Sequence, residues 1–261
     1  MPVDRSVTKV ALFPTCVVDA VAPEVGFATA RVLARRGCEV EVAERTTCCG
    51  QPAWNSGHAE PAAVVARTTL AGIEEALADG AEAVVVPAGS CTTMIRVFWP
   101  ELFAEVGQHD AARRARAVAP KVFELSEYLA SAKDDRPIGA EILHRSEGAA
   151  VRYHPSCHML RELGIRDQPC AALEGAGYDV GRGPERCCGF GGLFSVKLPE
   201  TSVAMADEVL DAAVAAGASD IVAADGSCLM QLATRAEARG LPLRFRHLAV
   251  ALDDAEAEAE I

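Results

Sequence analysis

The feature that most constrains the fold is a repeat spanning about half of the chain. Three landmarks occur in the first half and return in the same order in the second: VALFPTC as VRYHPSC, TTCCG as ERCCG, and PAGSC as ADGSC. Their cysteines are 141, 139 and 137 residues apart for the pairs Cys16 and Cys157, Cys48 and Cys187, and Cys91 and Cys228. Matched order with nearly constant separation indicates an internal duplication, so the 261 residues are expected to form two related units.

Each half alternates short apolar runs of strand character with helical patterns. In the first half we expect strands at 7–13, 39–43, 83–86 and 121–125, and helices at 24–36, 61–78 and 92–105. The second half supplies matching pieces at 151–154, 170–176, 199–216, 220–223 and 243–246. Strands separated by helices imply parallel sheets with right-handed crossovers. The predicted fold class is therefore α/β, with two pseudo-symmetric Rossmann-like units that have parallel sheets.

Charge and hydropathy exclude several classes of partner. The formal net charge is -12 and the basic residues form no run, which argues against a nucleic-acid-binding or anionic-lipid-binding surface. The first ten residues lack the apolar segment of a secretory signal, and no apolar stretch reaches the roughly 18 residues that cross a bilayer. A cytoplasmic protein without a membrane span is expected. Ten cysteines in that compartment favour metal binding or catalysis over structural disulfides.

Four of the repeated cysteines directly follow predicted strands and precede predicted helices: Cys16, Cys91, Cys157 and Cys228. In an open parallel sheet, ligands collect beyond the carboxyl ends of the strands. A helix N-terminus also favours thiolate over thiol, because its free N–H groups carry positive partial charge. The four cysteines are thus placed to be metal ligands.

The adjacent cysteine pairs discriminate between kinds of metal centre. Successive side chains on an extended backbone point apart, so both sulfurs reach one tetrahedral ion only with strain, whereas a multi-iron cluster offers each its own iron. Gly50 and Gly189 follow the pairs and allow the chain to bend sharply there. The sequence therefore favours iron–sulfur clusters, with zinc as the alternative.

The doubled pattern resembles the cysteine-rich CCG domain shared by heterodisulfide reductases, glycolate oxidase iron–sulfur subunits and the lactate-utilisation A family. The segments CCGQPAWNSG, CCGFGGLFSVKLPE and YHPSCHMLRELGI are most similar to the lactate-utilisation A family. The resemblance covers essentially the whole chain. The stretch 131–149 is rich in polar residues, Pro and Gly and lacks a repeat landmark, so it is expected to be a linker between an N-terminal CCG domain at 1–130 and a C-terminal CCG domain at 150–261.

The resemblance also implies iron–sulfur clusters, up to one per half. In heterodisulfide reductase the motif closes with C-x2-C, and five cysteines hold a noncubane cluster; here Met94 and Gln231 occupy the final positions. Four thiolates per half and an ordinary [4Fe-4S] cluster are therefore expected. The implied metal ligands and cofactor-binding residues are Cys16, Cys48, Cys49, Cys91, Cys157, Cys187, Cys188 and Cys228, with Gly50 and Gly189 beside the clusters.

For function, the resemblance implies an iron–sulfur subunit of a cytoplasmic complex that oxidises L-lactate, a 2-hydroxy acid, to pyruvate. Two further subunits are implied, one of them bearing ferredoxin-type clusters. This chain has no C-x2-C-x2-C-x3-C-P run, so its electrons must be exchanged with another protein or a small carrier. Two alternatives are a heterodisulfide-reductase-like thiol/disulfide redox protein and a non-catalytic cluster-binding sensor, although no DNA-binding element is evident.

Histidines distinguish the two halves near the cysteines. His154 and His158 bracket Cys157, where the first half has Phe13 and Val17, and both are candidate catalytic residues for proton-coupled chemistry in one half only. Surface positions are expected for the remaining histidines, which are His58, His109, His144 and His247.

The other candidates receive ordinary structural interpretations. Cys38 and Cys170 have no repeat counterpart and are expected to pack in the core. Three cations near motif cysteines would suit an organic acid, but surface solvation is preferred for each: Arg96, Arg161 and Lys197. The acidic end DDAEAEAE is expected to be a solvated helix end or tail.

Overall fold

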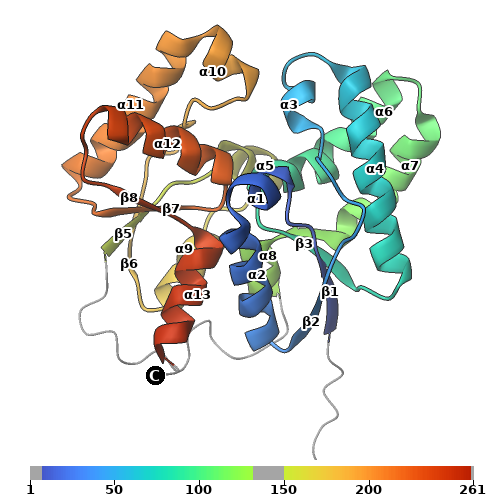
Figure 1. Ribbon diagram of the computed structural model, residues 1–261, viewed down its shortest axis with the longest axis horizontal. Coiled ribbons are helices and arrows are strands. Elements are labelled where there is room, and N and C mark those ends of the chain that lie inside the picture. Colours follow the sequence, from blue (N-terminus) through green and yellow to red (C-terminus); the bar gives the residue numbers. More distant parts are fainter. Residues whose placement is uncertain (1–7, 132–149, 260–261) are drawn as a thin grey trace, which may run out of the picture.

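The computed structural model describes residues 8–131 and 150–259. It contains two four-stranded sheets, one in each half, and every strand pair in them is parallel. Figure 1 shows the sheets in two lobes that lie side by side, with helices between them. The α/β prediction of two similar Rossmann-like units is confirmed.

The first sheet has the order β2-β1-β3-β4. Its strands are β1 (Thr8–Leu12), β2 (Cys38–Val42), β3 (Ala83–Val86) and β4 (Val122–Glu124). All four residues of β3 are buried, as expected for a central parallel strand of continuous apolar sequence. Because β1 and β3 are neighbours while their connections run to opposite sides, the topological switch point lies between them.

The second sheet repeats this arrangement in the order β6-β5-β7-β8. Its strands are β5 (Ala150–Tyr153), β6 (Asp179–Arg182), β7 (Asp220–Ala223) and β8 (Arg244–His247). The edge strand β6 was absent from the sequence prediction, because its sequence DVGR has little strand propensity. Its pairing with β5 determines its conformation, with Val151 opposite Val180.

Helices connect the strands of the first lobe. Its helical segments are α1 (Cys16–Val21), α2 (Pro23–Arg35), α3 (Gln51–Trp54), α4 (Ala59–Ala78), α5 (Gly89–Thr93), the π-helix η1 (Met94–Phe98), α6 (Trp99–Glu105), α7 (His109–Val118), the 3-10 helix η2 (Ala119–Lys121) and α8 (Leu125–Ser131). The helix expected at 92–105 is therefore divided by a π-helical turn. Pi turns occur often beside functional sites, and this one directly follows Cys91 and Thr93.

The second lobe is connected in the same way. Its helical segments are the π-helix η3 (Met159–Leu163), α9 (Gln168–Gly175), α10 (Leu193–Lys197), α11 (Pro199–Ala215), α12 (Gly226–Ala238) and α13 (Leu248–Ala259). The helices α4 and α11 occupy equivalent places in the two repeats, each between its CCG loop and a central strand. The sequence predicted both of them to within two residues.

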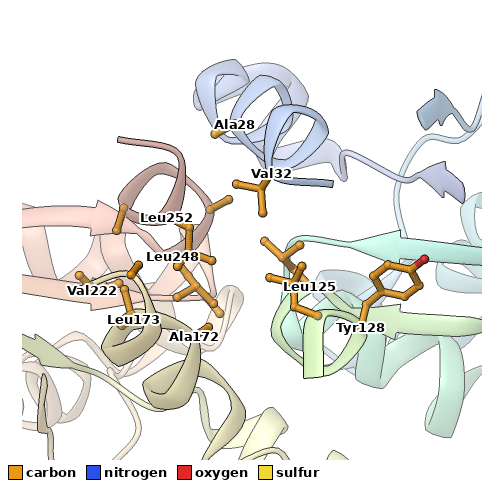
Figure 2. Close-up of a cluster of buried hydrophobic side chains, with 14 of the residues drawn as sticks. Ala28, Val32, Leu125, Tyr128, Ala172, Leu173, Val222, Leu248 and Leu252 are labelled. Carbon is orange, nitrogen blue, oxygen red and sulfur yellow. The ribbon is translucent and has the colours of Figure 1, made fainter. Parts of the chain in front are cut away.

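One hydrophobic core joins the two lobes. Figure 2 shows Val32 of α2 and Leu125 of α8 facing Leu248 and Leu252 of α13, with Leu173 of α9 alongside. These residues belong to a single buried cluster that includes side chains from both halves of the chain. Burying each such side chain stabilises the fold by about 1.5–3 kcal/mol, so the lobes are held together by ordinary core packing.

Ion pairs border this core where α2 packs on α13. Arg31 and Arg35 contact the Asp253 carboxylate at 2.5 and 2.7 Å, and Arg36 contacts Glu256 at 3.1 Å. The expectation that the acidic end is solvated was therefore wrong for these two carboxylates, because the other lobe supplies three guanidinium groups.

Two predictions concern regions at the limits of the structure. Of the linker 131–149, only Ser131 at the end of α8 is among the described residues, so the proposed division into two domains stays a proposal. A search of the described residues for helices that are both long and apolar enough to cross a bilayer found none.

Candidate metal centre

The switch point of each sheet positions two cysteines. Cys16 opens α1 directly after β1, and Cys91 lies in α5 directly after β3. Cys157 and Cys228 occupy the same positions after β5 and β7. Because neighbouring parallel strands end at the same edge, each pair of cysteines is carried to one place beside its sheet.

The adjacent cysteines lie in loops that end in a left-handed glycine. Gly50 has φ of 87° and Gly189 has φ of 84°, a conformation that glycine adopts without strain. Their backbone N–H groups point to the preceding sulfurs, with Gly50 N 3.4 Å from Cys48 Sγ and Gly189 N 3.4 Å from Cys187 Sγ. A Cβ on Gly50 would lie 2.8 Å from the Ala62 carbonyl oxygen, so the loop also packs tightly on α4.

The eight repeat cysteines therefore form two groups. In the first lobe, Cys16 Sγ lies 3.5 Å from Cys48 Sγ, and Cys49 Sγ lies 3.2 Å from Cys91 Sγ. In the second lobe, Cys188 Sγ lies 3.1 Å from Cys228 Sγ. Thiolates bound to one tetrahedral zinc are separated by roughly 3.8 Å, given Zn–S bonds of about 2.3 Å, so each contacting pair is close enough to share a metal centre.

The spread of the sulfurs bears on the kind of centre. Among the described residues, no three cysteines of the first lobe have sulfurs that all lie within 4.8 Å of one another. The four sulfurs form two close pairs and are spread more widely than the ligands of a single zinc ion. Soft thiolate ligands that are spread in this way fit an iron–sulfur cluster, which distributes its ligands over several irons.

One thiol in each group ionises more readily than the others. Hydrogen bonds from Cys16 and then Cys49, with a contribution from Gly50 N–H, lower the pKa of Cys48 to about 3. Hydrogen bonds from Cys157 and then Cys188 lower the pKa of Cys187 to about 2. The pKa of Cys16 is raised, chiefly because its thiol donates a hydrogen bond to Cys48, so ionisation in this pair favours Cys48.

The two groups face a common cavity of about 210 Å³. Its lining includes sulfur-bearing residues of both lobes, namely Cys16, Cys49, Cys91, Cys157, Cys187, Cys188 and Cys228. Figure 1 shows α1, α5 and α12, which begin at or carry three of these cysteines, at the junction between the lobes.

A buried carboxylate crosses between the lobes beside the cavity. Asp225 Oδ2 accepts a hydrogen bond from Ser90 N at 2.9 Å and Asp225 Oδ1 accepts one from Ser90 Oγ at 2.6 Å. Ser156 Oγ donates to Asp225 Oδ2 at 2.8 Å. Sequence analysis missed this residue, although comparison of the repeats offered a signal: Ala88 is the counterpart of Asp225 in the first half.

The two candidate catalytic histidines have different surroundings. His154 is 1% exposed, and its ring lies with Cys188 and Cys228 in a group whose ligand atoms are all within 4.8 Å. Burial lowers the pKa of His154 to about 4, so its ring is neutral at pH 7. His158 lines the cavity and lies 3.2 Å from Glu162. A catalytic role for either stays a prediction.

The remaining candidates lie apart from the cavity. Cys38 and Cys170 belong to or pack against the core between the lobes, as expected. Arg96 pairs with Glu127 at 2.6 Å, and the described lining of the cavity contains no arginine or lysine. Of the histidines expected at the surface, His58 and His109 are exposed and His144 is outside the described residues. His247 is buried at the end of β8, so that expectation was wrong.

Comparisons with known proteins agree with the duplicated geometry. The cysteine-rich domain family, CCG, matches residues 10–96 and again residues 151–233. Lactate utilization protein A from an Exiguobacterium strain is 40% identical, with 96% of this chain and 99% of that protein covered. Proteins of the same name from Bacillus cytotoxicus and Anoxybacillus flavithermus are each 39% identical over 94% of this chain, covering 98% and 99% of their own lengths.

Among solved structures, an aspartate racemase homologue from Pyrococcus horikoshii OT3 aligns with a TM-score of 0.34 at 11% identity and covers 97% of this chain and all of that one. The family assignment comes instead from the doubled cysteine motif and the full-length relatives. The chain belongs to the cysteine-rich CCG domain family, and within it to the lactate utilization protein A family.

Proposed function

We propose that this chain is the iron–sulfur subunit of a cytoplasmic L-lactate oxidation complex. Each lobe would bind up to one cluster, a [4Fe-4S] cluster held by four thiolates. The quartets are Cys16, Cys48, Cys49 and Cys91 in the first lobe, and Cys157, Cys187, Cys188 and Cys228 in the second. The observation that carries the proposal is the gathering of the repeat cysteines in each lobe, with sulfurs in close pairs, around one cavity.

The clusters would supply one-electron transfer. The chain contributes ligands, backbone N–H groups at Gly50 and Gly189 that stabilise thiolate charge, and burial that excludes water from Cys49 and Cys188. These contributions set the potential of a redox centre without requiring contact with a substrate.

The chemistry of the cavity favours an electron carrier over a substrate-binding protein. A 2-hydroxy acid carries a carboxylate, which needs a cationic partner, yet the described lining lacks arginine and lysine and includes Asp225. The acid is therefore oxidised on another subunit. This chain accepts the electrons there and passes them on.

The names of the relatives indicate lactate as the acid. Converting a 2-hydroxy acid to the 2-oxo acid releases two electrons and two protons. The electrons pass one at a time through this chain. The chain exchanges them with a partner protein that bears ferredoxin-type clusters. The protons leave at the substrate site, outside this chain.

The heterodisulfide-reductase-like alternative is less well supported. It needs an additional cysteine near the end of each motif, where this chain has Met94 and Gln231. Met94 is fully buried in the first core, and Gln231 donates a hydrogen bond to Ser202 at 2.9 Å. Neither side chain can act as a bridging thiolate, so the four-cysteine site is favoured.

Anaerobic purification of the full chain tests the proposal. We expect iron and acid-labile sulfide in equal amounts, up to four of each per lobe, and an EPR signal on reduction. Cys49→Ser should remove the first-lobe signal and Cys188→Ser the second, whereas Cys38→Ser, a core thiol, should remove neither. Stoichiometric zinc without sulfide, or equal metal loss in all three variants, would overturn the proposal.

Partner binding is tested separately. The full chain, tagged and expressed with its neighbouring subunits, should copurify with a protein that bears ferredoxin-type clusters. Reduction of this chain by lactate should then require the complete complex. Lactate-dependent reduction of the isolated chain would contradict the assignment of substrate oxidation to another subunit.

A further inference from the structure

An unpartnered imidazole lies beside the second sulfur group. His154 follows β5 and is 1% exposed, and neither ring nitrogen has a hydrogen-bond partner among the described residues. A ring nitrogen of His154 and the sulfurs of Cys188 and Cys228 all lie within 4.8 Å of one another. Burying a polar atom without a partner costs about 1–3 kcal/mol, and because nearly all buried polar groups have a partner, an unpaired one calls for an explanation such as a bound metal.

The first lobe provides an internal comparison. Phe13 N donates to Val85 O at 2.9 Å, and His154 N donates to Val222 O at 2.8 Å. The two residues therefore occupy equivalent positions after β1 and β5. Phe13 packs in an apolar cluster with Cys49 and Cys91, so the first lobe has a ring that cannot bind metal where the second has imidazole.

The residue type at position 154 suits a ligand. A neutral imidazole offers a nitrogen lone pair for coordination. Imidazole and thiolate also occur together in known metal centres, both on zinc and on iron–sulfur clusters.

We propose that His154 is a nitrogen ligand of the metal centre in the second lobe, alongside Cys188 and Cys228. The inference rests on the proposed function, since it requires a bound centre. It makes the two lobes chemically unequal: the first has thiolate ligands only, and the second has thiolates and a neutral imidazole. His154 then takes the place of one of the four thiolates proposed for the second lobe, and because exchanging anionic thiolate for neutral nitrogen raises the reduction potential of an iron–sulfur cluster, the second lobe is the stronger electron acceptor.

Pulsed EPR on the full chain tests this ligand. A Cys49→Ser, Cys91→Ser background removes the first-lobe signal and isolates the second. With ¹⁵N-labelled histidine, the reduced protein should show a strongly coupled nitrogen. His154→Phe, which reproduces the first lobe, should abolish this coupling and lower the midpoint potential. His109 is exposed and outside the cavity lining, so His109→Ala should leave both unchanged.

The outcomes separate this inference from the proposed function. Iron and sulfide without histidine coupling would overturn His154 ligation and leave the clusters in place. A coupling that was lost in His109→Ala would do the same. The labelled protein with native His154 gives this result even if His154→Phe does not fold. If zinc alone is bound, the cluster proposal fails, and X-ray absorption then decides: a nitrogen shell at about 2.0–2.1 Å supports the ligand and an all-sulfur shell at about 2.3 Å overturns it.

Discussion

Ser90 of the first lobe and Asp225 of the second are joined by two hydrogen bonds, from the serine N–H and from its hydroxyl group. The carboxylate is 2% exposed and also accepts a bond from Ser156. It thus fixes the start of α5, which carries Cys91, against the start of α12, which carries Cys228. The separation of the two sulfur groups depends on this contact.

Asp225→Ala should lower the free energy of unfolding by about 3 kcal/mol, because it leaves the buried Ser156 hydroxyl and two part-buried donors of Ser90 without an acceptor. Ser90→Ala removes one of these bonds and should cost about 1 kcal/mol. Ser227, the equivalent serine in the second repeat, contacts no carboxylate in the described part of the chain, so Ser227→Ala should change stability by less than about 0.5 kcal/mol. Anaerobic urea titration measures all three, and equal effects of the two serine variants would contradict the assignment.

Gly189→Ala should displace the second CCG loop. The residue has positive φ, and a Cβ there would collide with the backbone carbonyl oxygen of Ser202. We expect a loss of more than about 2 kcal/mol in stability and a loss of bound metal from the second lobe. Gly57 has a similar φ of 78° with open space around it, so Gly57→Ala should cost only about 1 kcal/mol and retain the metal. Full metal content in Gly189→Ala would argue against this account.

Glu124 should make stability depend on pH. Burial raises its pKa to about 7, with opposing hydrogen bonds from Ser126. The folded state therefore holds a proton that the unfolded state releases near pH 4.5, so this contribution to stability is complete below that pH and is lost as the pH rises to about 7. The loss is about 3 kcal/mol at most.

Glu124→Gln should remove this dependence. The free energy of unfolding of the variant minus that of the native chain should therefore increase between pH 4.5 and 7 and stay constant above pH 7. Exposed Glu105→Gln provides the control. Thermal unfolding at a series of pH values gives the comparison, and parallel curves for the native chain and Glu124→Gln would contradict the prediction.

Asp253→Asn should weaken the packing of α13 on α2. Burial raises the pKa of Asp253, but hydrogen bonds from Arg31 and Arg35 outweigh it and hold the pKa below its usual range. The ion pairs therefore stabilise the fold above the unfolded-state pKa of about 3.9, and this contribution is lost as the pH falls through the lower folded-state value. At neutral pH the variant should lose about 1 kcal/mol.

The neighbouring Asp254 is half exposed and 3.8 Å from Arg246, so Asp254→Asn serves as the matched control with a smaller effect. Urea unfolding at low and high salt gives the comparison. A loss in Asp253→Asn that did not diminish at high salt would show that packing, and not charge, is responsible.

Local pattern was sufficient to identify the duplication, most strands and the cysteines at their ends. The strand AVVV at 83–86 was predicted with its observed bounds, because a central parallel strand is apolar on both faces. The position of four repeat cysteines, two at one edge of each sheet, followed as well, since neighbouring parallel strands end at the same edge. Strand β6 was missed because tertiary pairing overrides its weak propensity.

The relation between the lobes depended on packing that no local pattern encodes. Ser90 and Asp225 are 135 residues apart, and Arg31 and Asp253 are 222 apart, and they meet only because α2, α8, α9 and α13 pack into one core. The sequence by itself determined which sulfurs gather in each half. Only the tertiary structure decided that both groups of sulfurs face one cavity. It also placed His154 beside the second group, with no hydrogen-bond partner among the described residues. The reason is that burial and pairing are properties of the packed chain.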